Sequence, residues 1–197
     1  MAESYAPLLH HTLSRDARLP RRTDSATQAR VTAASPALQV MTDLEQVDAV
    51  RIAPGIAIDA ALERMKTSGV RLLFVTGPGD ELLGVITARD IEGEKPVRVQ
   101  HELGVTRAEV LVRDIMTARE SIEVLLLDDV ERARVGDVVA TLRSIGRQHA
   151  LVVDPRGGVQ RIRGLFSTSR VGRQLGSTLE VGETAHGFAE IGAALRR

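Results

Sequence analysis

The feature that most constrains the fold of this chain is an internal repeat with a period of about 77 residues. Equivalent positions recur at nearly this spacing: Gly69 and Gly146, Val75 and Val152, 40–42 and 115–117, and 84–87 and 164–167. The last pair is spaced slightly more widely because the second copy has a longer turn at 154–158, where an insertion is tolerated. Each copy of about 55–60 residues is marginally stable alone, so the two are expected to share a core.

Each copy shows the same order of predicted elements. An amphipathic helix, with apolar residues three and four positions apart, ends at Gly69 or Gly146. A strand, a turn and a second strand follow, and a further helix begins at Thr87 or Ser167. The predicted class is therefore α/β, with helices and sheets layered as in α+β proteins and the two copies related by a pseudo-twofold axis. The predicted helices and strands are 58–66, 72–75 and 82–86 in the first copy and 135–142, 150–153 and 162–166 in the second.

The segments outside the repeats are expected to be an arm, a linker and a tail. The first 37 residues lack apolar periodicity. Thr106 and Glu109 form a capping-box pattern that opens a short helix in the linker. Apolar residues near the C-terminus are spaced as in an amphipathic helix. The predicted boundaries are 1–37 for an irregular arm, 38–92 for repeat 1, 93–110 for the linker, 111–175 for repeat 2 and 176–197 for a helical tail.

Composition narrows the functional class. The 197 residues carry 26 basic and 26 acidic side chains, whereas a protein that binds nucleic acid through phosphate contacts is usually basic. The absence of cysteine excludes disulfides and thiolate metal sites. No apolar run approaches the roughly 18 residues of a membrane-spanning helix, and the N-terminus lacks the pattern of a signal peptide. We therefore expect a soluble cytoplasmic protein that binds neither nucleic acid nor membrane.

The ordered set of motifs, present twice, resembles the CBS domain family, whose members typically occur as tandem pairs. The resemblance covers most of the chain, from residue 38 to residue 175. It implies two packed repeats, often a homodimer, and the binding of AMP, ADP, ATP or S-adenosylmethionine to regulate a partner protein. The matching residues are Met41-Thr42, Asp114-Ile115-Met116-Thr117, the glycines after the first helices, Val152-Val153-Asp154 and Gly84-Val85-Ile86-Thr87-Ala88-Arg89-Asp90.

The stretch from Gly84 to Asp90 is the sharpest candidate site. Thr87 stands at a predicted helix N-cap, beside free backbone N–H groups that favour a phosphate. Asp90, one turn later, can accept two hydrogen bonds from a ribose diol. Val85 and Ile86 could wall an adenine ring, and Arg89 could reach a phosphate. The alternative for Thr87 and Asp90 is ordinary helix capping.

By analogy with the family, repeat 2 supplies the opposite wall of this site. The expected residues are Met116 and Thr117 at the start of the repeat, and Gln148, His149 and Ala150 leading into its strand. Gln148 and His149 could contact the base or a phosphate. The alternative is a solvated loop before a strand.

The second copy of the motif departs from the family pattern. It keeps the glycine and the hydroxyl of Ser167, but Arg170 stands where an aspartate is expected, and Arg cannot accept from a ribose diol. Val70 and Arg71 would lie opposite. This second site is expected to be empty or to bind an anion through Arg170 and Ser167, which leaves at most one good nucleoside site per chain.

The remaining polar groups indicate neither catalysis nor a metal site. The His10-His11 pair and His101 lack carboxylate or cysteine partners at ligand spacing, and the acidic residues at 128–131 are interpreted as a solvated turn. No Walker loop, Rossmann fingerprint or set of nucleophile, base and oxyanion donor is present. We therefore expect no enzymatic activity, no cofactor and no metal. Two functions remain: a nucleotide sensor that signals to an unidentified partner protein, and a dimeric scaffold with a vestigial nucleotide cleft.

Overall fold

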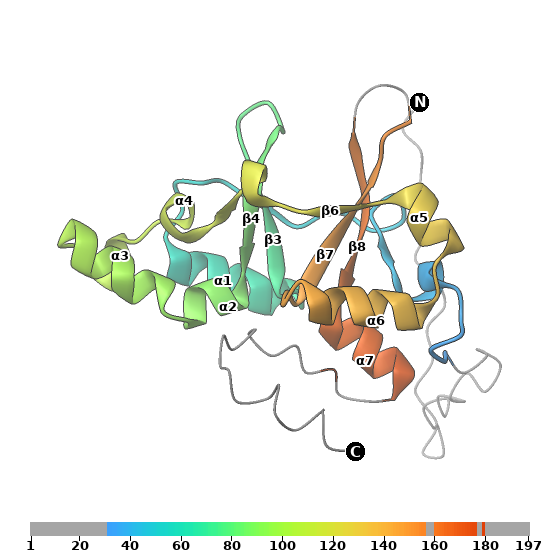
Figure 1. The fold of residues 1–197 in the computed structure, drawn as a ribbon. Helices are drawn as coiled ribbons and strands as arrows, with labels where there is room; N and C mark the ends of the chain where they lie inside the picture. The colour runs from blue at the N-terminus through green and yellow to red at the C-terminus, as the bar shows by residue number, and fades with distance from the viewer. Residues whose placement is uncertain (1–30, 157–159, 177–178, 180–197) are drawn as a thin grey trace, which may run out of the picture. The chain divides into compact units, whose positions relative to one another are not determined.

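The computed structural model describes residues 31–156, 160–176 and 179. Most of the predicted N-terminal arm and the predicted C-terminal helix lie outside these residues. The elements are arranged as Figure 1 shows. In chain order they are η1 (Ala37–Val40), β1 (Thr42–Asp43), β2 (Arg51–Ile52), α1 (Ile58–Ser68), β3 (Leu72–Thr76), β4 (Leu82–Thr87), α2 (Ala88–Glu92), α3 (Lys95–Leu103), η2 (Arg107–Glu109), α4 (Val112–Ile115), β5 (Thr117–Ala118), η3 (Arg119–Ser121), β6 (Val124–Leu126), α5 (Leu127–Arg132), α6 (Val135–Ser144), β7 (His149–Asp154), β8 (Arg161–Ser167) and α7 (Thr168–Leu175).

Each repeat builds its own half of the fold around an antiparallel hairpin, β3–β4 in repeat 1 and β7–β8 in repeat 2. A short strand pairs in parallel with each hairpin, β2 with β3 and β6 with β7. The result is two four-stranded sheets, with strand orders β2-β3-β4-β5 and β1-β8-β7-β6. The mixed α/β class predicted from the repeats is therefore confirmed.

The two repeats exchange their first strands. In repeat 1, β1 pairs antiparallel with β8 of repeat 2, with Thr42 opposite Leu165. In repeat 2, β5 pairs in the same way with β4, with Thr117 opposite Val85. Each sheet is thus completed by a strand of the other repeat. The Arg163 guanidinium on β8 donates a hydrogen bond to the Asp43 carboxylate on β1 and reinforces one of the two exchanges.

A glycine stands where each exchanged strand approaches its new sheet. A Cβ at Gly84 would lie 2.4 Å from the backbone carbonyl oxygen of Thr117. A Cβ at Gly164 would lie 2.6 Å from the carbonyl oxygen of Thr42. Both distances are far below van der Waals contact, and the obstructing atoms are backbone. The recurring glycine and the recurring Met-Thr pair are therefore two parts of one contact.

Three apolar clusters hold the described residues together. Two of them lie one in each half, where helices cover the outer face of a sheet. The cluster of repeat 1 includes Leu73 and Val75, and the cluster of repeat 2 includes Val152. The third lies between the sheets and contains Leu72, Phe74, Val85 and Leu151. Because successive strand residues point to opposite faces, β3 contributes alternately to two clusters, which explains its continuous apolar run.

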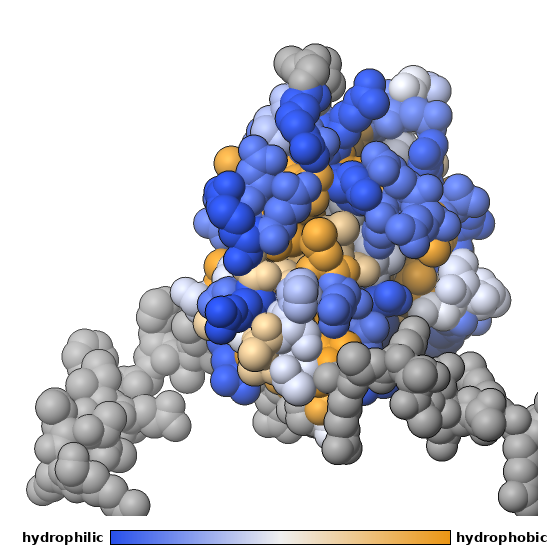
Figure 2. All heavy atoms as spheres, turned by 90° about the vertical axis from the view of Figure 1, so that its right-hand side faces the viewer, coloured by the Kyte–Doolittle hydropathy of each residue, from blue (hydrophilic) through white to orange (hydrophobic). Residues whose placement is uncertain are grey.

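The end formed by η1, α5 and the start of α6 is shown in Figure 2. Hydrophilic side chains cover most of this face, and apolar side chains are exposed between them. Leu38 and Leu126 contribute to the exposed apolar surface of the chain, and each residue is 42% exposed.

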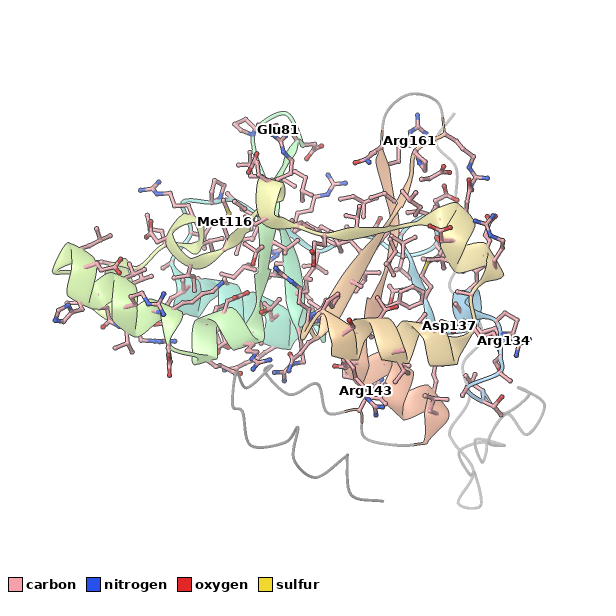
Figure 3. The ribbon with its side chains drawn as sticks, viewed as in Figure 1. Glu81, Met116, Arg134, Asp137, Arg143 and Arg161 are labelled. Carbon is pink, nitrogen blue, oxygen red and sulfur yellow. The ribbon has the colours of Figure 1, made fainter. Side chains whose placement is uncertain are left out.

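Acidic residues fix the starts of three helices in the same way. The backbone N–H before the first turn donates to a carboxylate three residues later, at 2.8 Å in each case. The carboxylates are Asp90 in α2, Asp114 in α4 and Asp137 in α6. Figure 3 shows Arg134, whose N–H makes this bond, beside Asp137. These acids therefore have a structural use that is independent of any ligand.

Helices α3 and α5 lie where the sequence predicts no helix. Helix α3 occupies half of the predicted linker, with Pro96 buried in its first turn and Gly104 in the left-handed conformation at its end (φ 65°). Helix α5 replaces the predicted solvated turn, because Leu127 and Val130 are buried while the acidic residues between them remain exposed. The predicted Thr106–Glu109 capping box is present but opens only the three-residue 3-10 helix η2.

Candidate functional site

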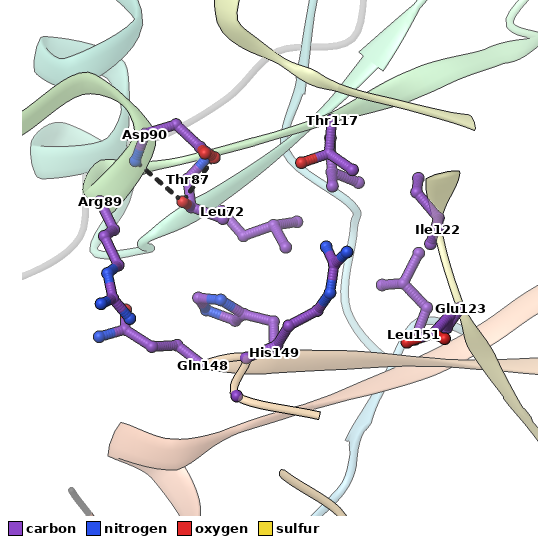
Figure 4. Close-up of a pocket in the computed structure, with 13 residues that line it drawn as sticks. Leu72, Thr87, Arg89, Asp90, Thr117, Ile122, Glu123, Gln148, His149 and Leu151 are labelled. Carbon is purple, nitrogen blue, oxygen red and sulfur yellow. Dashed lines mark hydrogen bonds between the residues drawn. The ribbon is translucent and has the colours of Figure 1, made fainter. Parts of the chain in front are cut away.

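Residues of both repeats line a cavity of about 260 Å³, here called cleft 1 (Figure 4). Repeat 1 contributes the start of β3, the end of β4 and the start of α2. Repeat 2 contributes β5, the segment before β6, the turn before β7 and the start of β7. The lining residues are Leu72, Val85, Thr87, Arg89, Asp90, Thr117, Ile122, Glu123, Gly146, Arg147, Gln148, His149 and Leu151.

Asp90 is the most constrained polar group of cleft 1. Its Oδ2 accepts hydrogen bonds from the backbone N–H of Thr87 at 2.8 Å and from the Thr87 hydroxyl at 2.7 Å. The Thr87 hydroxyl in turn accepts from the Asp90 N–H at 3.2 Å. The Lys95 ammonium lies 2.6 Å from Oδ1. The carboxylate is only 14% exposed, so it caps a helix and borders the cleft at once.

These bonds limit what Asp90 can still accept. An ionised carboxylate offers about four lone-pair sites, and Thr87 and Lys95 occupy three of them. One ribose hydroxyl could use the remaining site on Oδ1, but a second hydroxyl requires the Lys95 ammonium to move. Lys95 is 44% exposed, so its long side chain has room to do so. Helix α2 has only five residues, so its N-terminus contributes little to anion binding.

Seven of the ten residues predicted for this site line cleft 1. They are Val85, Thr87, Arg89, Asp90, Thr117, Gln148 and His149. The structure places Ile86 and Ala150 in the two outer clusters, because neighbouring strand residues point to opposite faces. Met116 packs against the outer cluster of repeat 1 and beside Gly84. These three residues therefore pack behind the residues that line the cleft and do not border the cleft themselves.

Six lining residues were not predicted. Leu72 and Leu151 could have been found by strand alternation, since Leu151 shares a face with His149. Arg147 could have been found from the repeat, because it occupies the position in the second copy that Val70, which is predicted for the second site, has in the first. Ile122 and Glu123 belong to a segment without a motif, and no sequence signal indicates them. Gly146 was predicted only as a helix end.

The four residues predicted for the second site lie together around another cavity, of about 470 Å³, here called cleft 2. The Ser167 hydroxyl accepts a hydrogen bond from the Arg170 N–H at 3.2 Å and caps α7. Arg170 occupies the place in this motif that Asp90 has in the first. The residues predicted for cleft 2 are Val70, Arg71, Ser167 and Arg170, and each lines the cavity.

His149 lies between the clefts and lines both of them. Burial, and to a lesser extent the Arg71 guanidinium, lower the pKa of its imidazole to about 4, while the Asp90 carboxylate acts in the opposite direction. His149 is therefore neutral at physiological pH and can accept or donate a hydrogen bond at the wall that separates the clefts.

The partly buried imidazole of His149 predicts a loss of stability in mild acid. His149 binds a proton near pH 6.5 in the unfolded chain and only near pH 4 in the folded chain. The contribution of neutral His149 to the free energy of unfolding is therefore complete above pH 6.5 and is lost as the pH falls towards 4. Between pH 7.5 and 5.5 the free energy of unfolding should drop by about 1 kcal/mol from this residue. Urea unfolding of His149→Leu should lack that part of the drop. The exposed His101→Gln should keep it, and equal slopes for the two variants would contradict the assignment.

Two negative observations concern the described residues only. Within residues 31–156 and 160–176, no group of three or more His, Asp or Glu side chains is arranged to hold a metal ion. None of the helices there is long and apolar enough to cross a membrane.

Comparison with known proteins identifies the fold. Residues 38–94 match the model of the CBS domain, while no curated relative matches the chain. An uncharacterized conserved protein from Pyrococcus horikoshii is similar, with 19% identity over 77% of this chain and 100% of its own, at a TM-score of 0.53. The CBS domain structure NE2398 has 21% identity over 68% and 94%, at 0.50. CBSX2, solved in complex with AMP, has 21% identity over 71% and 94%, at 0.47.

The fold of two four-stranded sheets is thus shared with the Pyrococcus horikoshii protein and with the CBS domain structure NE2398. The match to the family model lies on η1 to α2, the segment that carries the first copy of the motifs. Residues 38–94 of the chain are a CBS domain.

Proposed function

We propose that the chain is a regulatory module that binds an adenosine-containing ligand in cleft 1. The observation that carries this proposal is the composition of the cleft wall. A nearly buried carboxylate, Asp90, stands beside apolar side chains contributed by both repeats. The match of residues 38–94 to the CBS domain supports the ligand class.

The lining residues match the three parts of a nucleotide. Leu72, Val85 and Leu151 offer apolar surface for a planar base, as ligand sites commonly do. Asp90 is placed to accept from ribose hydroxyls. Arg147 borders the cleft and can meet a phosphate. The Glu123 carboxylate nearby offsets part of that positive charge, which favours a ligand of low charge.

Regulation follows from the position of cleft 1 between the repeats. A ligand held there contacts β4 and α2 of one repeat and the start of β7 of the other. It therefore stabilises the arrangement of the repeats that closes on it and shifts the population towards that arrangement. In our proposal the protein is a homodimer, and a partner protein binds differently to the two arrangements. The protein acts in the cytoplasm and catalyses no reaction.

A dimeric scaffold with a vestigial cleft is the second candidate. One observation favours it: Asp90 already has partners within the protein, Thr87 and Lys95. Its presence is thereby explained without a ligand. The two candidates differ in whether the cleft discriminates between small molecules.

Calorimetric titration of AMP, ADP, ATP and S-adenosylmethionine into the full chain separates the two candidates. The regulatory proposal expects saturable binding of at least one of the four, at one site per chain that also accepts neutral adenosine. A folded protein that binds none of the four would leave the scaffold as the better account.

A further inference from the structure

We propose that cleft 2 binds a multiply charged phosphate group, held by the guanidinium groups of Arg71, Arg170 and Arg173. The site lies between α7 and the end of α1, on the other side of His149 from cleft 1. The proposal does not depend on nucleoside binding in cleft 1, since it concerns different residues and a different ligand chemistry.

The charges that border the two clefts differ. Cleft 1 has two arginines and two carboxylates along its wall. Cleft 2 has the three arginines and a single carboxylate, Asp48. The excess of positive charge in cleft 2 favours an anion of more than one charge, because each guanidinium can form paired hydrogen bonds with phosphate oxygens.

Within the described part of the chain, few acidic groups neutralise the arginines of cleft 2. Among the residues that the structure describes, the side chains of Arg170 and Arg173 form no ion pair and no hydrogen bond. Arg71 has one ion pair, to the exposed carboxylate of Glu92 at 3.8 Å. Guanidinium groups gathered at one cavity repel one another, and a bound anion would relieve that repulsion.

The local structure brings these groups to one place. Arg170 and Arg173 are three residues apart in α7 and therefore lie on the same side of the helix, which runs beneath the sheet of repeat 2 in Figure 1. Arg71 approaches from the turn after α1. A neighbouring cavity of about 380 Å³ is also bordered by Arg71 and Arg173, together with the hydroxyl of Ser169. The basic surface thus continues beyond cleft 2 and has room for more than one phosphate.

Arg170 occupies in cleft 2 the position that a carboxylate, Asp90, has in cleft 1, and this difference determines which ligand groups cleft 2 can bind. A carboxylate can accept from the hydroxyls of a sugar, and a guanidinium can only donate. Cleft 2 is therefore expected to select its ligand by negative charge. Phe74 and Leu165 form an apolar part of its wall, which leaves space for the organic part of a phosphorylated small molecule.

Inorganic pyrophosphate is the probe that tests this proposal, since it has the charge without a base or a sugar. Calorimetric titration into the full chain at low ionic strength should show saturable binding. Arg170→Gln and Arg173→Gln should each weaken it at least tenfold. The control is Arg98→Gln, an exposed arginine of α3 that borders none of the cavities described above, and it should bind like the wild type.

Three results would overturn the proposal: no saturable binding of pyrophosphate, equal weakening by Arg98→Gln, or undiminished binding in both Arg170→Gln and Arg173→Gln. Titration of the Asp90→Ala variant separates this site from cleft 1. Pyrophosphate binding should persist there, and its loss in Asp90→Ala alone would assign the anion to cleft 1. Because pyrophosphate has no ribose, a failure of nucleoside binding in cleft 1 would not affect this result.

Discussion

Replacing Gly84 by Ala is expected to lower the free energy of unfolding by about 3 kcal/mol, at the upper end of the usual cost of overpacking. The new Cβ would lie 2.4 Å from the Thr117 carbonyl oxygen. That atom belongs to the backbone of β5, so no side chain can rotate to make room. The strand must move away from β4, and the exchange that joins repeat 2 to the sheet of repeat 1 is weakened.

Gly55→Ala is the matched control for this prediction. Gly55 is exposed, and a Cβ built on it meets no atom within 4 Å. Its substitution should change the stability by no more than about 0.5 kcal/mol. Urea unfolding followed by far-ultraviolet circular dichroism measures both variants. If Gly84→Ala were as stable as Gly55→Ala, the close approach of β5 to β4 would not exist in solution.

Asp90→Ala is expected to cost about 2 kcal/mol of stability in the absence of any ligand. The substitution removes the capping interaction, worth about 1 kcal/mol, and the ion pair of a nearly buried carboxylate with Lys95. Asp114→Ala removes only the equivalent acceptor for the N–H of Leu111 and a longer contact with Arg113 at 3.8 Å. It should therefore cost about 1 kcal/mol.

Denaturant unfolding of the two aspartate variants without ligand makes this comparison. A smaller loss for Asp90→Ala than for Asp114→Ala would mean that the Thr87 and Lys95 contacts contribute little. The scaffold alternative would then lose the observation that favours it, because a structural role would no longer explain Asp90.

The local elements were predictable because their signals are local. The spacing of Ile58, Ala61 and Met65 predicts α1, and the three residues are buried as that spacing requires. Strand β3 is predicted from its apolar run, and the recurrence of both elements in the second copy predicts the second half of the fold. Because the same pattern occurs in two copies, each copy independently predicts the same fold class.

The exchange of β1 and β5 was not predictable from these patterns. A strand of two residues has no periodicity, and the partner strand of both β1 and β5 belongs to the other repeat. Gly84 and Gly164 are the sequence signal of the exchange, because a glycine within a strand often marks a close backbone approach. Helix α3 was missed although Pro96 and Gly104 are typical of a helix start and end.

The sequence predicts the residues of the candidate site that belong to a motif and misses most of the others. The stretch around Thr87 and Asp90 carries a helix-start signal and lies in cleft 1. The motif alone predicts Ile86 in the cleft, but strand alternation turns its side chain into the core. Ile122 reaches the cleft only through the tertiary fold, which no short-range pattern encodes.

The most direct test of the central claim is calorimetric titration of AMP, ADP, ATP and S-adenosylmethionine into Asp90→Ala and Asp114→Ala, well below the unfolding midpoint of each. Both variants lose a helix-capping acid, but only Asp90 borders cleft 1. The ligand that binds the wild type should bind Asp90→Ala at least tenfold more weakly, or about 1.4 kcal/mol, and should bind Asp114→Ala with unchanged affinity. Equal affinities for the two folded variants would contradict ligand binding at Asp90 and with it the regulatory role of cleft 1.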